Sequence, residues 1–352
     1  MSCCFFLLWV AAWALLQTGC AGEQNLERYE FTRVSMGVPA RILLYARNQQ
    51  SAMDAAAAAF ERIASLDDCM SDYRPTSELM RLCARAGGPA QHVSEDLFRI
   101  LSQACEISQA SDGAFDVTVG PMVRLWRAAR TSRVPPTPGD ILAARDLVGW
   151  EKIVLNPSTR TARLNGAGMA LDLGGIAKGY AAHQAVELLK SGGHPRCLVS
   201  MSGDISAGDS PPGTSGWEVQ IGLPPVHGVD SRHIQVLVLS NASVSTSGDT
   251  QQFVELAGVR YSHIVDPRTG MGATNRTMCT VVAREGSAAD GYSSAACVMG
   301  AEAAVAMFAR VQNIAAIVWT DIQSGEAPRI HDPRGILRLS TQPMEQMSGP
   351  GR

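Results

Sequence analysis

The stretch from Leu171 to Tyr180 has the residue types and spacing of a turn that could bind a phosphate. An apolar run ends in Asp172, two glycines follow, and a helical pattern opens at Ala177-Lys178. This predicts a strand, a tight turn and a helix N-terminus, where unpaired N–H groups and a partial positive charge favour anions. The glycine spacing differs from that of the GxxxxGK[ST] phosphate loop, so an ordinary strand-to-helix turn is the alternative interpretation.

A carboxylate and two hydroxyls lie together at another predicted helix start, in Asp290-Gly291-Tyr292-Ser293-Ser294. Asp290 and Ser294 are four residues apart, so they share one helix face one turn apart. Their hard oxygen atoms suit Mg²⁺, which keeps waters and shares oxygens with substrate phosphates. The alternative is that Asp290 simply caps the helix N-terminus.

Five aspartates sit in turns at the ends of predicted strands. They are Asp116, Asp172, Asp204, Asp249 and Asp266. Each one alone could be a turn residue with a local hydrogen bond. Five in one domain favour a ligand site, because binding groups concentrate on such loops.

His263 is the candidate acid/base group among the seven histidines. It shares a predicted strand face with Tyr261 and Val265, just before the turn at Asp266-Pro267. An imidazole there could exchange a proton near neutral pH, although a structural role is the alternative. The sequence has no GxSxG segment, so serine-hydrolase chemistry finds no support.

The composition is that of a globular protein. Of the 352 residues, 46% are hydrophobic and 18% are charged, and the formal net charge is −3. This length allows one large domain or two ordinary ones. A nucleic-acid partner would need a basic patch, and the sequence has no Lys/Arg cluster, so we expect no such partner.

Residues 1–20 have the features of an export signal. The apolar run from Cys4 to Leu16 is too short to span a bilayer comfortably and has the length of a signal-peptide core. Small residues then lead to Cys20 and resemble the lipid-attachment box of bacterial lipoproteins, although no Lys or Arg precedes the core. We expect export to the periplasmic side of the inner membrane, with a lipid on Cys20 as a candidate anchor.

The six cysteines that follow Cys20 have irregular spacings, and none forms a CxxC pair. Several lie in apolar runs, as Cys197, Cys279 and Cys297 do. They are predicted to be buried free thiols that act as small hydrophobic residues, and we expect no zinc site.

The elements that must position these groups predict an α+β fold. Helices are expected over 50–66, 94–110, from 177 and over 288–310 with a break near Gly300; strands over 31–35, 40–46, 196–201, 217–223, 234–240, 260–265, 278–283 and 314–320; a hairpin over 152–164; and a polar turn over 244–249. Because hairpins and strand–helix–strand units both occur, we expect mixed or antiparallel sheets flanked by helices. A single catalytic unit over 30–335, which could have two lobes, would follow a linker over 21–29 and precede a disordered tail over 336–352.

Seven short motifs follow one another along the chain. They are Ser35-Met36-Gly37, Ser71-Asp72-Tyr73-Arg74-Pro75-Thr76-Ser77-Glu78, Gly113-Ala114-Phe115-Asp116-Val117-Thr118-Val119-Gly120-Pro121, Asp172-Leu173-Gly174-Gly175-Ile176-Ala177-Lys178-Gly179-Tyr180, Thr246-Ser247-Gly248-Asp249, His263-Ile264-Val265-Asp266-Pro267-Arg268-Thr269-Gly270 and Ala289-Asp290. Together, over residues 30–320, they resemble the ApbE family, the FAD:protein FMN transferases once named thiamine-biosynthesis lipoproteins. The order of seven motifs is far more specific than any one of them.

The resemblance implies an exported, often lipid-anchored enzyme that splits the pyrophosphate of FAD with Mg²⁺. It would attach FMN by a phosphoester bond to a Thr or Ser of an acceptor flavoprotein and release AMP. Carried over by motif, the residues that would contact FAD are Met36, Tyr73, Ala114, Phe115, Asp116, Asp172, Lys178 and Ile264. The metal ligands would be Gly175, through its carbonyl, with Asp290 and Ser294, and Ser293 would lie close by.

The chain departs from the family at a few of these positions. The family usually has Thr where Ser294 stands, and Ser keeps the hydroxyl. Asp is common where His183 stands, and Tyr where Thr250 stands, which affects local contacts and not the chemistry.

Phosphoryl transfer asks the protein mainly to position groups and to neutralise charge. We hypothesise that His263, or Asp249 nearby in the sequence, accepts the proton of the attacking hydroxyl. Two other functions stay open: a Mg²⁺-dependent FAD pyrophosphatase, in which water replaces the acceptor, and a lipoprotein that binds FAD without turnover. The presence of Asp290 favours an enzyme.

Overall fold

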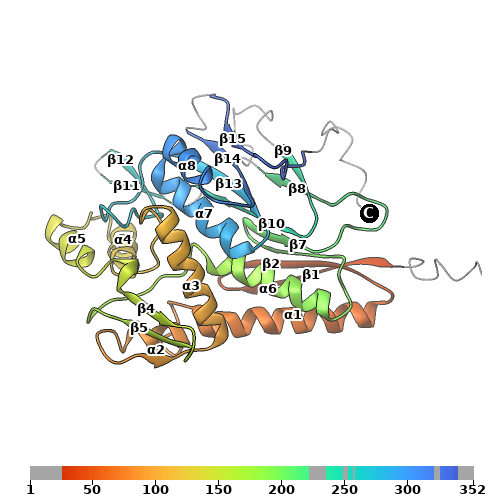
Figure 1. Ribbon diagram of the computed structural model, residues 1–352, viewed down its shortest axis with the longest axis horizontal. Helices are drawn as coiled ribbons and strands as arrows, with labels where there is room; N and C mark the ends of the chain where they lie inside the picture. The colour runs from red at the N-terminus through yellow and green to blue at the C-terminus, as the bar shows by residue number, and fades with distance from the viewer. Residues whose placement is uncertain (1–25, 222–234, 249–252, 257, 321–325, 340–352) are drawn as a thin grey trace, which may run out of the picture.

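An eight-stranded antiparallel sheet forms the centre of the structure, a computed structural model that describes residues 26–221, 235–248, 253–256, 258–320 and 326–339 (Figure 1). Its strands, in spatial order, are β1 (Glu27–Ser35), β2 (Val38–Ala46), β6 (Cys197–Met201), β7 (Asp204–Ala207), β10 (Ala242–Ser247), β13 (Met278–Ala283), β14 (Ile314–Trp319) and β15 (Arg329–His331). Every neighbouring pair in this sheet is antiparallel.

Both faces of the sheet are covered, because side chains on a strand alternate between its faces. Ile42, Val199 and Val281 belong to the core beneath the helices, whereas their neighbours Leu43 and Leu198 belong to a second core. The helices on the first face are α1 (Gln49–Met70), α3 (Glu95–Ala110), α6 (Ala177–Ser191), α7 (Gly286–Met299) and α8 (Ala301–Phe308) (Figure 1). The hairpin of β8 (Trp217–Ile221) and β9 (Gln235–Leu239) covers the second face.

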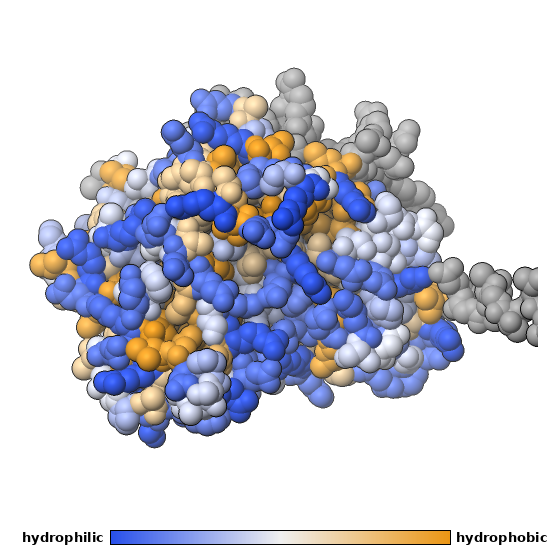
Figure 2. All heavy atoms as spheres, viewed as in Figure 1, coloured by the Kyte–Doolittle hydropathy of each residue, from blue (hydrophilic) through white to orange (hydrophobic). Residues whose placement is uncertain are grey.

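A smaller group of elements packs around Trp126 at the left end of the molecule in Figure 1. It contains α4 (Gly120–Ser132), α5 (Pro138–Arg145), β11 (Phe253–Leu256) and β12 (Val259–Ser262). The remaining elements are α2 (Glu78–Cys83), a 3₁₀ turn (Trp150–Lys152) and a three-stranded sheet of β3 (Gln91–His92), β5 (Thr161–Leu164) and β4 (Ile153–Asn156). The face of the molecule shown in Figure 2 is more hydrophilic than hydrophobic, as expected of helices that bury one stripe.

The predicted α+β fold with helix-flanked antiparallel sheets is confirmed. Ser94 caps α3 by accepting a hydrogen bond from Leu97 N, β13 has the predicted bounds, and the break between α7 and α8 falls at Gly300. All six described cysteines are free thiols, and the predicted burial is confirmed for Cys197, Cys279 and Cys297, whereas Cys69, Cys83 and Cys105 are only half-buried. Among the described helices, none is long and apolar enough to cross a membrane.

The polar segment 244–249 was predicted as a turn, and most of it is instead a central strand. β10 pairs with β7 on one side and with β13 on the other. Its hydroxyls find partners across the sheet: Ser243 bonds to Ser206, and Thr246 to Thr280, each at 2.8 Å. A polar strand can be buried when its hydrogen bonds are satisfied in this way.

Two predicted local structures around the site are also wrong. The run before Asp172 is not a strand, since its only sheet pairing in the described structure is one parallel bridge between Ala170 and Val119. Asp290 does not begin a helix, because α7 starts four residues earlier at Gly286, which rules out the N-cap interpretation.

The outer boundaries of the folded unit differ from the expected ones. β1 begins at Glu27, inside the stretch 21–29 that was expected to be a linker. At the other end, residues 336–339 do not belong to a tail, since Arg338 O accepts a hydrogen bond from Val238 N at 2.7 Å and Leu337 packs on the second core. Residues 1–25, with Cys20, and residues 340–352 lie outside the described residues.

Candidate functional site

A cavity of about 920 Å³ opens at one end of the central strands of the sheet. The antiparallel register brings three chain segments to this end, because Ala40 pairs with Met201, Met201 with Asp204, and Asp204 with Ser245. The two-residue turn Met36–Gly37 lies there as well, with φ of 49° and 76°. Such left-handed backbone suits a tight hairpin, but it is uncommon for Met and places this side chain at the cavity wall.

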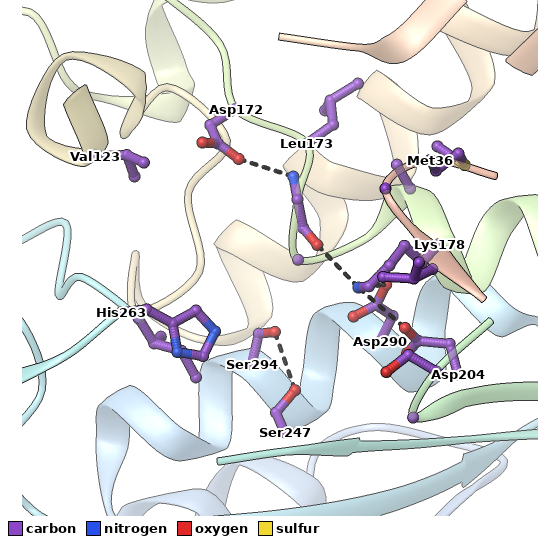
Figure 3. Close-up of a pocket in the computed structure, with 18 of the residues that line it drawn as sticks. Met36, Val123, Asp172, Leu173, Lys178, Asp204, Ser247, His263, Asp290 and Ser294 are labelled. Atoms are coloured by element: carbon purple, nitrogen blue, oxygen red, sulfur yellow. Dashed lines mark hydrogen bonds and ion pairs between the residues drawn. The ribbon is translucent and has the colours of Figure 1, made fainter. Parts of the chain in front are cut away.

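Lys178 lies at the deep side of the cavity, in the first turn of α6 (Figure 3). Its Nζ is 3.0 Å from an Asp204 carboxylate oxygen, 3.8 Å from Asp290 Oδ2 and 3.2 Å from the Gly174 carbonyl, to which it donates a hydrogen bond. Burial alone would lower the pKa of Lys178, but the two carboxylates raise it above its usual value. The amine is therefore a fixed positive charge.

Asp290 is buried, and its position depends on a close crossing of two helices. Gly179 N donates to Asp290 Oδ2 at 3.1 Å. At this crossing, a Cβ on Gly179 or on Gly286 would overlap the carbonyl oxygen of the other glycine. Burial and the Asp204 carboxylate raise the pKa of Asp290, while Lys178 opposes this rise.

Two further oxygen-bearing groups, the Ser294 hydroxyl and the Gly175 backbone, line the cavity with Asp290. A Cβ on Gly175 would lie 3.1 Å from Ser294 Oγ, so the Gly175 backbone is against that hydroxyl. Ser294 Oγ also shares a hydrogen bond of 3.3 Å with Ser247 Oγ (Figure 3). A carboxylate, a hydroxyl and a backbone carbonyl are hard ligands of the kind that Mg²⁺ prefers. Among the described residues, no cluster of three or more His, Cys, Asp or Glu side chains could hold a metal ion.

The wall near the cavity mouth is held by Arg127 from α4. Its guanidinium bonds to Asp72 and, at 2.9 Å, to Asp172, and it lies 4.4 Å from the centre of the Tyr73 ring. Asp172 also accepts a hydrogen bond from Gly174 N at 2.8 Å. Burial, and to a lesser extent the negative charge of Asp72, raises the pKa of Asp172. Arg127 thus ties the loop around Tyr73 to the turn before α6.

Asp116 lines the cavity, but its carboxylate also supports the loop on which it lies. It accepts hydrogen bonds from Thr118 N and from Trp150 N, both at 2.8 Å, and burial raises the pKa of Asp116. Beside it, the side chains of Phe115, Ile264 and Met36 give the cavity an apolar part.

His263 lies across the cavity from Lys178 in Figure 3, with Ser294 and Asp290 between them. It stands just past the end of β12 at Ser262, so it is not the strand residue that was expected. Asp249 lies outside the described residues.

All the predicted site residues except Ser293 and Asp249 line this one cavity. Ser293 is buried behind it, where its Oγ donates to the Asp290 carbonyl at 2.9 Å and bonds to Ser247 at 2.8 Å. The sequence did not point to Arg127, and Ser247 stood in one of the seven motifs without a role of its own. Asp204 had a signal as one of the five turn aspartates, but it received no role.

The comparisons with known proteins agree with this arrangement. The ApbE family matches residues 36–318. A FAD:protein FMN transferase of Vibrio cholerae is 30% identical, with 85% of this chain and 90% of the relative covered, and one of Treponema pallidum is 29% identical, with 90% and 91% covered.

A solved structure, the flavin transferase ApbE from Vibrio cholerae, superposes with a TM-score of 0.77. It is 26% identical, and the match covers 88% of this chain and 98% of that one. The match to the family spans most of the chain, including the cavity residues from Met36 to Ser294. The chain therefore belongs to the ApbE family.

Proposed function

We propose that this protein is a Mg²⁺-dependent FAD:protein FMN transferase that attaches FMN to a Thr or Ser of an acceptor flavoprotein and releases AMP. The names of the two relatives support the transferase activity. The observation that carries the proposal is the combination of Lys178 with the oxygens of Asp290, Ser294 and Gly175 in one cavity. A cavity of about 920 Å³ is within the range of small-molecule sites, about 300–1,000 Å³.

Some residues of the cavity would bind the flavin, and others would neutralise the charge of the pyrophosphate. The apolar side chains of Met36, Phe115 and Ile264 would hold the flat part of FAD, and the pyrophosphate would lie toward Lys178 and the N-terminus of α6. Gly175, Asp290 and Ser294 would hold Mg²⁺, which supplies charge neutralisation on the pyrophosphate when bound. Lys178 adds a positive charge that needs no reorganisation during the reaction.

The proton of the attacking hydroxyl needs an acceptor, and we propose His263 for this role. Replacing His263 with Ala should lower FMN transfer about 100-fold, within the usual range for a lost general base, with little change in the apparent affinity for FAD. Single-turnover transfer to an acceptor peptide measures this. Full transfer by the variant would exclude His263 and leave Asp249 as the candidate.

Gly175→Val should lower activity before it lowers stability. The Cβ position is already 3.1 Å from Ser294 Oγ and 3.4 Å from the Phe115 ring, so a branched side chain would push between the metal ligands. We expect a transfer rate at least about tenfold lower and a melting temperature within a few degrees of the wild type. A variant with normal turnover would argue against Gly175 as a backbone ligand.

One incubation separates the proposed activity from its two alternatives. The purified protein is mixed with FAD, Mg²⁺ and a peptide that bears a candidate acceptor Thr, with a Thr→Val peptide as the matched control. Labelled Thr peptide supports the transferase, FMN plus AMP without labelled peptide supports a FAD pyrophosphatase, and unchanged FAD supports a binding protein.

We also propose that the protein is exported to the periplasmic side of the inner membrane and anchored by a lipid on Cys20. The apolar run from Cys4 to Leu16 and the small residues before Cys20 support this. The intact mass of the mature protein tests it, since an unmodified N-terminus would contradict the anchor.

A further inference from the structure

Asp204 is a buried carboxylate at the cavity to which the proposed reaction gives no role. It is 4% exposed and starts β7, directly after the turn Ser202–Gly203. One of its oxygens accepts a hydrogen bond from Ser245 Oγ on the neighbouring strand β10, and the other lies 3.0 Å from Lys178 Nζ. Its position is therefore fixed by the sheet on one side, and it faces the Lys178 amine on the other (Figure 3).

Lys178 is shared unequally between two carboxylates. Its Nζ is 3.0 Å from Asp204 and 3.8 Å from Asp290, a difference of 0.8 Å. The first distance is that of a charge-assisted hydrogen bond, and the second is too long for one. Lys178 is held in this place by its bond to the Gly174 carbonyl as well.

The charges of these three groups explain why the position of Lys178 affects the binding of a cation. With both carboxylates ionised, they and the one ammonium carry one net negative charge, which attracts a divalent ion. Without the Asp204 charge, Lys178 and Asp290 would form a neutral pair, and the amine would lean toward the one carboxylate left. The carboxylate proposed to bind the metal would then be occupied by an ammonium.

We propose that Asp204 is a positioning residue that holds the Lys178 ammonium away from Asp290 and so keeps the Asp290 carboxylate open to a divalent cation. The inference rests on the proposed function only in the choice of Mg²⁺ as that cation. It assigns Asp204 an action through Lys178, without contact between Asp204 and the metal.

Binding of Mn²⁺, used as a probe for Mg²⁺, tests this directly. Free Mn²⁺ is measured by electron paramagnetic resonance during titration of the purified protein without FAD. Asp204→Asn should raise the Kd for Mn²⁺ about 10- to 100-fold, as loss of a residue that orients a metal ligand usually does. Adding Lys178→Met to this variant should restore most of the affinity, because the competing ammonium is then gone.

The double variant separates positioning from the alternatives. If Asp204 bound the metal itself, or served only to hold the fold, Lys178→Met would raise the Mn²⁺ affinity no more in the Asp204→Asn protein than in the wild type, and the proposal would be wrong. An unchanged Kd in Asp204→Asn would equally overturn it. Ser206→Ala is the matched control, since Ser206 is a buried residue of the same strand that bonds to Ser243 at 2.8 Å, and it should leave the Kd unchanged.

Ser245→Ala gives a milder test if the Asp204 variants do not fold. It removes only the hydroxyl that orients Asp204, and we expect about a fivefold higher Kd, the effect of losing one hydrogen bond. The result is independent of the transfer reaction. If the Kd for Mn²⁺ shifts as expected but the wild-type protein does not transfer FMN, the proposed function is rejected and this inference stands. If the wild-type protein transfers FMN but the Kd does not change in the variants, this inference is rejected and the proposed function stands.

Discussion

Asp290→Asn is expected to lower FMN transfer about a thousandfold or more while the protein stays folded. The amide keeps the size of the side chain and can still accept the hydrogen bond from Gly179 N, but it removes the charge proposed to hold Mg²⁺. Metal-assisted charge stabilisation contributes several kcal/mol to a transition state, and about 4 kcal/mol corresponds to a thousandfold in rate. Burial raises the pKa of Asp290, so folding disfavours its charge and a neutral isostere should not lower stability.

Asp96→Asn is the matched control, with the opposite expected result. Asp96 is a partly buried carboxylate away from the cavity, bonded to Arg62 at 2.6 Å and to the Tyr180 hydroxyl at 2.8 Å. Its loss should lower the melting temperature and leave the transfer rate of the folded protein unchanged. Rates from single-turnover transfer and melting curves from circular dichroism give both quantities. An Asp290→Asn variant within tenfold of the wild-type rate would remove Asp290 from the reaction.

Gly286→Ala should destabilise the protein by about 3 kcal/mol, at the upper end of what overpacking usually costs. A methyl group there would overlap the Gly179 carbonyl oxygen, and both partners are helix backbone that cannot rotate away. The direction is informative, because Gly→Ala within a helix normally stabilises it by up to about 1 kcal/mol. Urea denaturation measures the free energy of unfolding.

Gly291→Ala in the same helix is the control for this prediction. Its new Cβ would meet the end of the Ile107 side chain, which can move, so we expect a change within about 1 kcal/mol. Equal stability of Gly286→Ala and the wild type would mean that α6 and α7 can separate at little cost. We also expect the Gly286 variant to transfer FMN poorly when folded, since the crossing sets the spacing of Lys178 and Asp290.

Periodicity predicted the apolar elements well and the polar ones poorly. β13 is a run of buried residues with the expected bounds, and the helix cap at Ser94 follows from a local rule. β10 was missed because Ser243, Ser245 and Thr246 have the composition of a loop. Only the pairing with β7 and β13 gives these hydroxyls the partners that allow them inside.

The candidate site was predictable as a set of motifs but not as a geometry. Ordered motifs named most of the residues that line the cavity, because each motif is a short run of residues with a local signature. Arg127 bonds to Asp72 and Asp172, which lie 55 and 45 positions away in the sequence, respectively. No local sequence pattern predicts such contacts. The closeness of Gly179 and Gly286 likewise depends on how two helices cross.

The length of the first strand of the sheet sets the distance between the start of the folded unit and the cavity. β1 has nine residues, begins at Glu27 and ends beside the cavity turn at Met36. At about 3.3 Å per residue, a strand of this length spans roughly 30 Å. With the N-terminal anchor proposed above, the cavity would lie about that far from Glu27, at the far end of the strand.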